Sequence, residues 1–446
     1  MQKNIILILL FSIVAFSCEK STVDKLFDES ANTRAATLIE KYKTQLAAPQ
    51  YGWKGTYYPD GANAGGYSFY LKFDIYGGLT MYSDVAGLKA DQAFETTYQV
   101  KSLQKPTLIF DTYSYLHELV NPDYNGGTGK SADLELIIDS ATDDKITLTG
   151  TRNNTEMVLT KLSSNEFESV KKGGIKDIFK NTVDLISSES YTIINFPTGD
   201  KADVFIDLDT KIVTLYFISN NSISTKEAAF YTTPTGIQFR NPIVIFGSTI
   251  QELIWDNTLK TYYYTSGSNR VNLVQSIKPA MPFYFALGTF FSSIVFDPDI
   301  PSQSTVYKNL NAEIKAKTIA LSTAAPVRVI GDIYFYYIAE DGVFALVFDY
   351  TRTYTDRVDS FGGVLFYAPV VDANGNITFT RQSQTATLVD GELFSGISPI
   401  ISDGVKSFTD ILEQNKFNWD FDSVEPNTAT LKSIQNPTII IKGTLY

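Results

Sequence analysis

The sequence is poor in the residues that build most catalytic and metal sites. Its 446 residues include one cysteine and one histidine. A zinc site of two or three histidines within one chain is therefore excluded, and so is an internal disulfide. Any Ser-His-Asp triad would have to use His117, and no nucleophile-elbow motif accompanies it. We predict no catalytic residues, no metal and no cofactor, and we expect His117 to be a partly buried imidazole bonded to a neighbour.

Positive charge is also scarce. Lys and Arg together number 37 and Asp and Glu 49, which gives a net charge of −12. Nucleic acid requires clustered cations, so we predict no nucleic-acid partner. The same balance argues against electrostatic adhesion to anionic lipid, and its main effect is on solubility.

The longest apolar run lies near the N-terminus. It reads IILILLFSIVAF and follows a single lysine. This layout is typical of a secretory signal, and the run is shorter than the roughly 20 apolar residues of a membrane span. The small residues Ala15 and Ser17 stand close before Cys18, as in bacterial lipoproteins whose cysteine is acylated. We predict a lipoprotein signal peptide at residues 1–17, lipid on Cys18 and a tether at 18–33. The alternative is an ordinary signal peptide with an incidental cysteine.

Aromatic residues, in contrast, are abundant at 13% of the chain. Runs such as YSFYLKF, IYFYYI and VFALVFDY are rich in aromatic and β-branched residues and alternate, which indicates β-sheet. Helical spacing occurs at residues 34–46, where Asn32 or Thr33 would cap the helix, and a second short helix is expected at 304–317. We predict a mainly β fold with a few short helices. Its antiparallel β-rich modules are consecutive, and an amphipathic helix precedes the first.

An internal repeat suggests how the modules are arranged. YSFYLKFDIYGGLTMYSD at residues 67–84 is echoed by ADVFIDLDTKIVTLYFIS at 202–219. The period is much longer than that of a solenoid, so we expect consecutive modules and not a superhelix. We predict β-rich modules at residues 34–170, 175–275 and 280–446, the second related to the first.

Three further motifs have ordinary explanations that we favour. NGGTGKS lacks the first glycine of a phosphate-binding loop, because Tyr124 stands at that position. DANGN opens like a calcium loop, but Ile377 replaces the required glycine. Paired acids in two short segments could hydrolyse a glycosidic bond or bind calcium, although solvated acids beside a turn explain them better. These acids are Asp203, Asp207, Asp209, Asp297 and Asp299.

Three stretches, in this order, carry a resemblance to a known family. They are GWKGTYYPDGANAGGYSFYLKFDIYGGLTMYSD (52–84), LIFDTYSYLHELVNP (108–122) and ADLELIIDSATDDKITLTGT (132–151). The chain resembles domain-of-unknown-function family 4302, a group of lipoproteins from the Bacteroidetes phylum. The resemblance is strong over residues 25–165 and weaker to residue 275.

The resemblance implies an exported protein anchored in the outer membrane through lipid on Cys18, at the cell surface or the periplasmic face. Genes of such proteins tend to accompany a surface lipoprotein and a TonB-dependent transporter, which are the expected partners. The family supplies no catalytic residues. Rings can stack on sugars or anchor peptides, although core packing also explains many aromatics. The candidate ligand-binding residues are Trp53, Tyr57, Tyr58, Tyr113 and His117.

The favoured function is a non-catalytic binding or accessory protein of a nutrient-uptake system that captures a glycan or a peptide. Two alternatives stay open: a hydrolase that uses carboxylates alone, and a structural or assembly lipoprotein of the outer membrane. An exposed row of rings in a groove would favour capture, and two facing acids in a deep cleft would favour hydrolysis. A flat apolar patch with neither feature would favour assembly.

Overall fold

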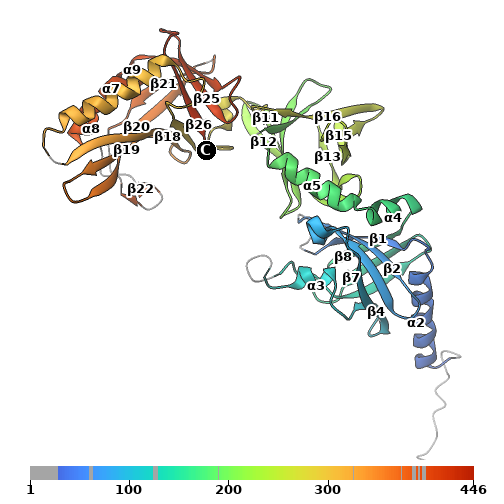
Figure 1. Cartoon of the computed structure of the whole chain (residues 1–446). Helices are drawn as coiled ribbons and strands as arrows, with labels where there is room; N and C mark the ends of the chain where they lie inside the picture. The colour runs from blue at the N-terminus through green and yellow to red at the C-terminus, as the bar shows by residue number, and fades with distance from the viewer. Residues whose placement is uncertain are drawn as a thin grey trace, which may run out of the picture.

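Strands dominate the computed structural model, which confirms the predicted mainly β fold with a few short helices. The structure describes residues 29–59, 64–123, 129–188, 190–324, 326–372, 374–383, 388–389, 392–393 and 398–446. The predicted signal peptide and Cys18 lie outside the described residues. Three eight-stranded antiparallel sheets each close into a barrel (Figure 1).

Around each barrel the strands follow their order in the chain, although helices lie between some of them in the first and third barrels. The first barrel contains β1 (Trp53–Tyr58), β2 (Tyr67–Phe73), β3 (Gly78–Ser83), β4 (Phe94–Ser102), β5 (Pro106–Phe110), β6 (Glu135–Ala141), β7 (Lys145–Gly150) and β8 (Glu156–Lys161). The second contains β9 (Tyr191–Asn195), β10 (Lys201–Asp207), β11 (Ile212–Ser219), β12 (Ser222–Thr233), β13 (Gly236–Ile245), β14 (Ser248–Asp256), β15 (Thr261–Ser266) and β16 (Asn269–Ser276). The third contains β17 (Ser293–Phe296), β18 (Val327–Ile338), β19 (Val343–Thr353), β20 (Val358–Val371), β21 (Asn376–Arg381), β24 (Phe417–Phe421), β25 (Thr428–Ser433) and β26 (Ile440–Leu445).

Helices connect and cover the barrels, and a two-stranded ribbon lies beside the third. The helices are α2 (Ala31–Ala47), η1 (Asp84–Lys89), α3 (Tyr115–Val120), α4 (Ser164–Lys171), α5 (Gly174–Ile186), α6 (Phe283–Ala286), α7 (Thr305–Leu321), α8 (Pro399–Gly404) and α9 (Lys406–Gln414). The ribbon strands are β22 (Leu388–Val389) and β23 (Glu392–Leu393). Among the described residues, no helix combines the length and the apolar composition needed to cross a bilayer.

Two of the helices were expected from helical spacing. α2 covers the predicted range 34–46, but its cap is Ser30, whose hydroxyl accepts from Thr33 N, and not Asn32 or Thr33. α7 begins where the second helix was predicted and continues to Leu321. The sequence analysis did not single out α4 and α5, because the glycines at residues 173 and 174, where α5 begins, have the composition of a linker. There Gly173 adopts a left-handed φ of 89° and lets one helix follow the other.

The repeat seen in the sequence occupies equivalent places in two barrels. Residues 67–84 contain the β2–β3 hairpin, the second and third strands of the first barrel. Residues 202–219 contain the β10–β11 hairpin, which has the same position in the second barrel. In β3 and β11 buried side chains alternate with partly buried ones, whereas β2 is buried on both faces. The inward-facing side chains of these hairpins fill each interior, as expected for eight-stranded barrels.

The first two barrels meet through a buried ion pair. Asp84 and Lys211 are 2% and 4% exposed, and Lys211 Nζ lies 2.5 Å from Asp84 Oδ2. The same carboxylate accepts the backbone N–H of Ser68 at 2.8 Å and that of Thr232 at 2.9 Å. Ser68 Oγ also donates to the carbonyl of Thr232 at 2.7 Å. One carboxylate therefore holds β2 of the first barrel against β12 of the second.

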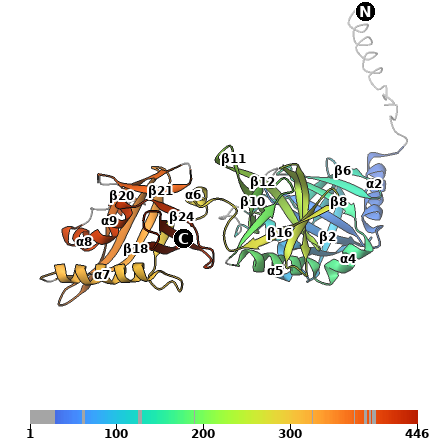
Figure 2. The ribbon, with the colours of Figure 1, turned by 90° about the horizontal axis from the view of Figure 1, so that it is seen from above.

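The second and third barrels meet through a different carboxylate. Asp203 on β10 accepts the backbone N–H groups of Ala280 (2.7 Å) and Met281 (2.9 Å), which belong to the segment between the two barrels. Beside it, Phe290 packs against Phe205 and Tyr216 of the second barrel, with ring centroids 5.0 and 5.3 Å apart. Figure 2 shows the third barrel, in orange and red, set to one side of the other two.

Removing the Asp84 carboxylate leaves the Lys211 ammonium buried without a partner. We expect Asp84→Ala to lower the free energy of unfolding by about 3–5 kcal/mol, because an unpaired buried charge keeps its full desolvation cost. Denaturant titration would measure the loss. The control is Asp184→Ala, which breaks the exposed Lys180–Asp184 pair and should cost less than about 1 kcal/mol. Equal losses in the two variants would contradict the assigned role of Asp84.

Asp203 should make stability depend on pH in an unusual direction. Burial raises the pKa of Asp203 from 3.8 to about 6, although the hydrogen bonds from Ala280 and Met281 oppose the rise. The folded protein therefore holds this proton more tightly than the unfolded chain does. The contribution of Asp203 to the free energy of unfolding is fully present below pH 3.8 and is lost as the pH rises through about 6. The total loss is about 3 kcal/mol.

The measurement is the free energy of unfolding of the wild type minus that of Asp203→Asn, followed across this pH range. Asp207 on the same strand provides the control: burial raises its pKa, but hydrogen bonds from Thr210 and Asp209 outweigh burial and lower the pKa. Asp207→Asn should therefore show the opposite sign, with stability lost as the pH falls. If the difference in free energy of unfolding between the wild type and Asp203→Asn did not change with pH, the Asp203 carboxyl would not be desolvated.

Candidate functional site

A cleft of about 950 Å³ opens beside the Asp84–Lys211 pair, between the first and second barrels. Its walls come from η1 and α3 of the first barrel and from α5 and the β10–β11 turn of the second. Figure 1 shows α3 and α5 on their two barrels. The side chains that line it include Tyr67, Asp84, Leu88, Lys89, Phe94, Tyr115, Glu118, Asp123, Lys130, Phe179, Asp209 and Lys211.

The wall formed by η1 depends on a sharp local bend. Ser83 caps the helix by accepting from Val85 N, which places Asp84 at its start and inside the protein. Gly87 then turns the chain with φ 53° and ψ −118°. A Cβ at this position would lie 3.3 Å from the ring of Phe179 on α5. Gly87 therefore allows both the bend and the close approach of α5 that define this side of the cleft.

Aromatic rings gather around β4 and α3 of the first barrel, and two of them, Phe94 and Tyr115, line the cleft. Phe94 is at the centre of this group, with its ring centroid 5.2 Å from that of Tyr115 and 6.1 Å from that of Tyr113. His117 lies next to Tyr113 at 5.7 Å. Tyr115 is buried, but Tyr113 is 58% exposed. We call Phe94, Tyr113, Tyr115 and His117 the aromatic rim.

Charges of both signs surround this rim. Burial raises the pKa of Glu118, and the nearby Lys89 opposes the rise. Burial lowers the pKa of His117, while the negative charge of Asp111 opposes this shift. His117 is half-buried and shares a hydrogen bond of 3.0 Å with Ser114 Oγ, so it has the environment expected from the sequence. At neutral pH, the rim thus offers a neutral imidazole beside flat rings.

Comparison with known families identifies the chain. The sequence model of a family described as a domain of unknown function (DUF4302) matches residues 23–257, which is more than half of the chain. The chain belongs to this family. The matched DUF4302 segment contains the whole first barrel, β9 to β14 of the second and the cleft between them. The family resemblance inferred from the sequence is therefore confirmed.

Other comparisons add little to the DUF4302 assignment. No curated protein matches the chain. Among solved structures, the octameric penicillin-binding protein homologue from Pyrococcus abyssi shares 10% identity over 33% of this chain and 36% of its own, with a TM-score of 0.15. The isotype 1 transferrin binding protein B from serogroup B Neisseria meningitidis shares 8% identity over 88% of this chain and 75% of its own, with a TM-score of 0.13. Scores this low carry no argument about function. The chain thus spans about a third of the penicillin-binding protein homologue.

The structure separates the five predicted ligand-binding residues into three places. Trp53 and Tyr57 are fully buried inside the first barrel. The indole of Trp53 donates to Leu46 O at 2.8 Å, and the Tyr57 hydroxyl accepts from Asp133 N at 2.6 Å. Both rings therefore have partners within the core. The prediction that they bind a ligand stays untested, and the same holds for the other three residues.

Tyr58 lies at the barrel junction and not in the cleft. Its ring packs edge-on against Tyr231, and the Arg240 guanidinium carbon stands 4.2 Å from its centroid. Burial raises the pKa of Tyr58 to about 12, although Arg240 opposes this. Only Tyr113 and His117 come together, at the aromatic rim. Four cleft residues, Phe94, Tyr115, Phe179 and Lys211, were not predicted from the sequence. Tyr115 could have been found, because it lies in the same run, FDTYSYLHELV, as Tyr113 and His117.

The acids considered for hydrolysis or calcium binding have structural partners. Asp207 accepts from Asp209 N and Thr210 N in the β10–β11 turn. Asp297 accepts from Asp299 N in the same manner. Asp372 of DANGN accepts from Asn374 N and Asn376 N and pairs with Lys416. Across the described residues, no group of three or more His, Cys, Asp or Glu side chains could hold a metal ion. Residues 124–128 of the glycine-rich loop lie outside the described residues.

Proposed function

We propose that the protein is a non-catalytic binding protein that captures a glycan or a peptide in the cleft between its first two barrels. The observation that carries this proposal is the aromatic rim: Phe94 and Tyr115 line a cleft of about 950 Å³, and exposed Tyr113 packs against Phe94 and His117 outside that lining. Ligand pockets commonly measure about 300–1,000 Å³. Flat rings with polar edges stack on sugars and anchor peptide side chains.

The cleft suits binding better than hydrolysis. Hydrolysis by two carboxylates needs the acids to face each other about 5–10 Å apart across the scissile bond. Asp84 is already bonded to Lys211 and two backbone N–H groups. Of the acids considered in the sequence, Asp207 and Asp297 each accept a backbone N–H group two residues further along the chain. A ligand that enters the cleft therefore meets rings and scattered charges.

We also propose that the protein is anchored to the outer membrane through lipid on Cys18, at the cell surface or the periplasmic face. It would act beside a TonB-dependent transporter or a surface lipoprotein of a nutrient-uptake system. The support is the sequence pattern around Cys18 and the family resemblance. Attachment through several acyl chains holds a protein stably to a bilayer, whereas a single chain gives marginal binding.

Ligand binding should depend on the aromatic rim. A glycan array and a peptide library, each probed with the purified protein, would identify a ligand, and calorimetry would then give its affinity. We expect Tyr113→Ala and Phe94→Ala each to weaken binding about tenfold or more, because buried aromatic contacts carry much of the binding energy at such sites. The matched control is Tyr76→Ala, since Tyr76 is 96% exposed and lies in the turn between β2 and β3, not in the aromatic rim.

Two results would contradict the binding proposal. One is a ligand whose affinity the rim variants leave unchanged. The other is no ligand in either library together with a transporter that co-purifies in stoichiometric amount, which would favour an assembly role.

Anchoring depends on one thiol. Mass spectrometry of the protein from its native membrane should find acyl chains on Cys18 and no residues before it. In the Cys18→Ser variant, we expect the protein to move from the membrane fraction to the soluble fraction, because nothing remains to carry the lipid. A native protein with an unmodified Cys18 thiol would rule out the anchor.

A further inference from the structure

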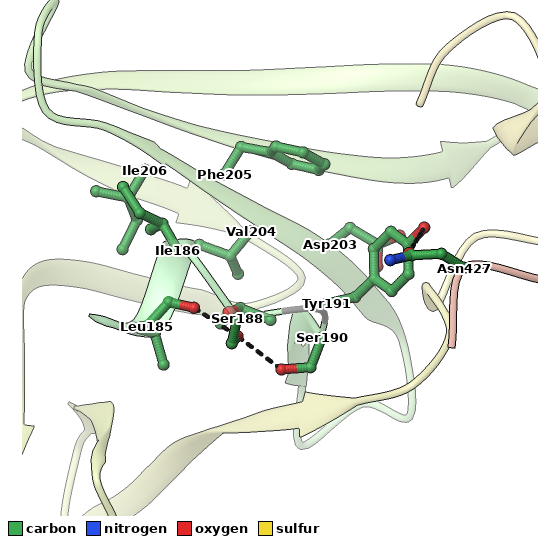
Figure 3. A pocket seen from close by; sticks show the side chains of 11 residues that line it. Leu185, Ile186, Ser188, Ser190, Tyr191, Asp203, Val204, Phe205, Ile206 and Asn427 are labelled. Carbon is green, nitrogen blue, oxygen red and sulfur yellow. Dashed lines mark hydrogen bonds between the residues drawn. The ribbon is translucent and has the colours of Figure 1, made fainter. Parts of the chain in front are cut away.

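A second pocket, of about 210 Å³, lies at the junction between the second and third barrels. Figure 3 shows the residues that line it: they come from the end of α5, from β9 and from β10 of the second barrel, and Asn427 comes from the third. Its volume equals that of about seven waters at about 30 Å³ each, enough for a small organic molecule. It is separate from the cleft and shares no lining residue with it.

The lining of the pocket mixes apolar and polar groups. Leu185, Val204 and Ile206 are aliphatic, and Phe205 is an aromatic residue that is 42% exposed. The other neutral polar groups are hydroxyls and an amide: Ser188, Ser190, Tyr191, Thr192 and Asn427. The Tyr191 hydroxyl donates to Asn427 Oδ1 at 3.4 Å, so the third barrel contributes to the lining.

Asp203 is the one charged side chain among the lining residues. It is 1% exposed, and among the described residues no lysine, arginine or histidine forms an ion pair with it. Its only hydrogen-bond partners in that part of the chain are the N–H groups of Ala280 and Met281, one on each oxygen. Each carboxylate oxygen can accept a further bond. A buried carboxylate with two neutral partners lacks the opposite charge that usually accompanies it.

The field of this carboxylate reaches into the pocket. After burial, the negative charge of Asp203 is the cause that raises the pKa of Tyr191, whose hydroxyl borders the pocket. At neutral pH Asp203 is ionised, because its pKa is raised only to about 6. Titratable groups on the surrounding elements are Tyr191 on β9, Tyr216 on β11 and Lys278 in the connecting segment. Lys278 is directed to Asp420 at 3.8 Å.

We infer that this junction pocket is a second binding site whose ligand is a small organic cation. The ammonium group of the ligand lies beside Asp203 and supplies the missing charge. Its carbon skeleton packs between the aliphatic side chains and the rings of Tyr191 and Phe205, which also attract cations through their faces. Because Asn427 and Asp203 belong to different barrels, one bound molecule contacts both. This site stands independently of glycan or peptide capture in the cleft.

The test compares two probes of nearly equal shape and different charge, cyclohexylammonium and cyclohexanol, titrated into the purified full-length protein at neutral pH. Nuclear magnetic resonance or calorimetry would give the affinities. We expect cyclohexylammonium to bind about tenfold or more tightly than cyclohexanol, as a charge-assisted bond in a buried site allows. Equal binding of the two probes, or no binding of cyclohexylammonium, would overturn the inference.

Variants then locate the site. Asp203→Asn should abolish the preference for the cation, whereas Asp207→Asn, which removes the same charge four residues along β10, should keep it. Asp203→Asn also removes the acceptor of the Ala280 N–H group, so Phe205→Ala provides a second variant at a partly exposed position. Phe205→Ala should weaken the binding of cyclohexylammonium about tenfold. The site would be refuted if Asp203→Asn still preferred cyclohexylammonium to cyclohexanol, or if Phe205→Ala left the affinity for cyclohexylammonium unchanged.

Discussion

The buried Asp84 carboxylate is the contact on which the arrangement of the first two barrels depends. It binds the Lys211 ammonium and two backbone N–H groups from different barrels. A desolvated ion pair is stable only where geometry and further hydrogen bonds satisfy both groups. The pair is therefore specific to one relative position of the barrels. The same position opens the cleft, because η1 and the β10–β11 turn, which carry the two charges, are also two of its walls.

The junctions of the chain differ in how their charges are compensated. At the first junction a lysine neutralises the carboxylate, whereas at the second Asp203 has only peptide N–H partners among the described residues. Rings cover the second junction, with Phe290 packed against Phe205 and Tyr216. A buried carboxylate without a cationic partner is held by its hydrogen bonds alone, so the contact of Asp203 with the connecting segment depends on the two N–H groups of Ala280 and Met281.

Much of the local structure could be predicted from the sequence, because alternation and helical spacing are local properties. The strand 67–73 and the helix around residues 34–46 are examples. Asp84 and Lys211 could not be paired, because they are 127 residues apart and each lies in an ordinary turn sequence. At the cleft, the run that contains Tyr113 and His117 was a usable signal. Trp53 and Tyr57 were equally aromatic, but only the closure of the barrel decides that their rings point inward.

The way the third barrel closes has a consequence for its biosynthesis. Its sheet closes when β17 pairs with β26. Between these two in the chain lie α7, α8, α9, the other six strands of the barrel and the ribbon of β22 and β23. In the first barrel, β1 pairs with β8 after a shorter interval. Until β26 has been synthesised, β17 presents an unpaired edge, which is a template for wrong pairing with other chains. Protection by chaperones during synthesis therefore matters more for this module than for the two that emerge before it.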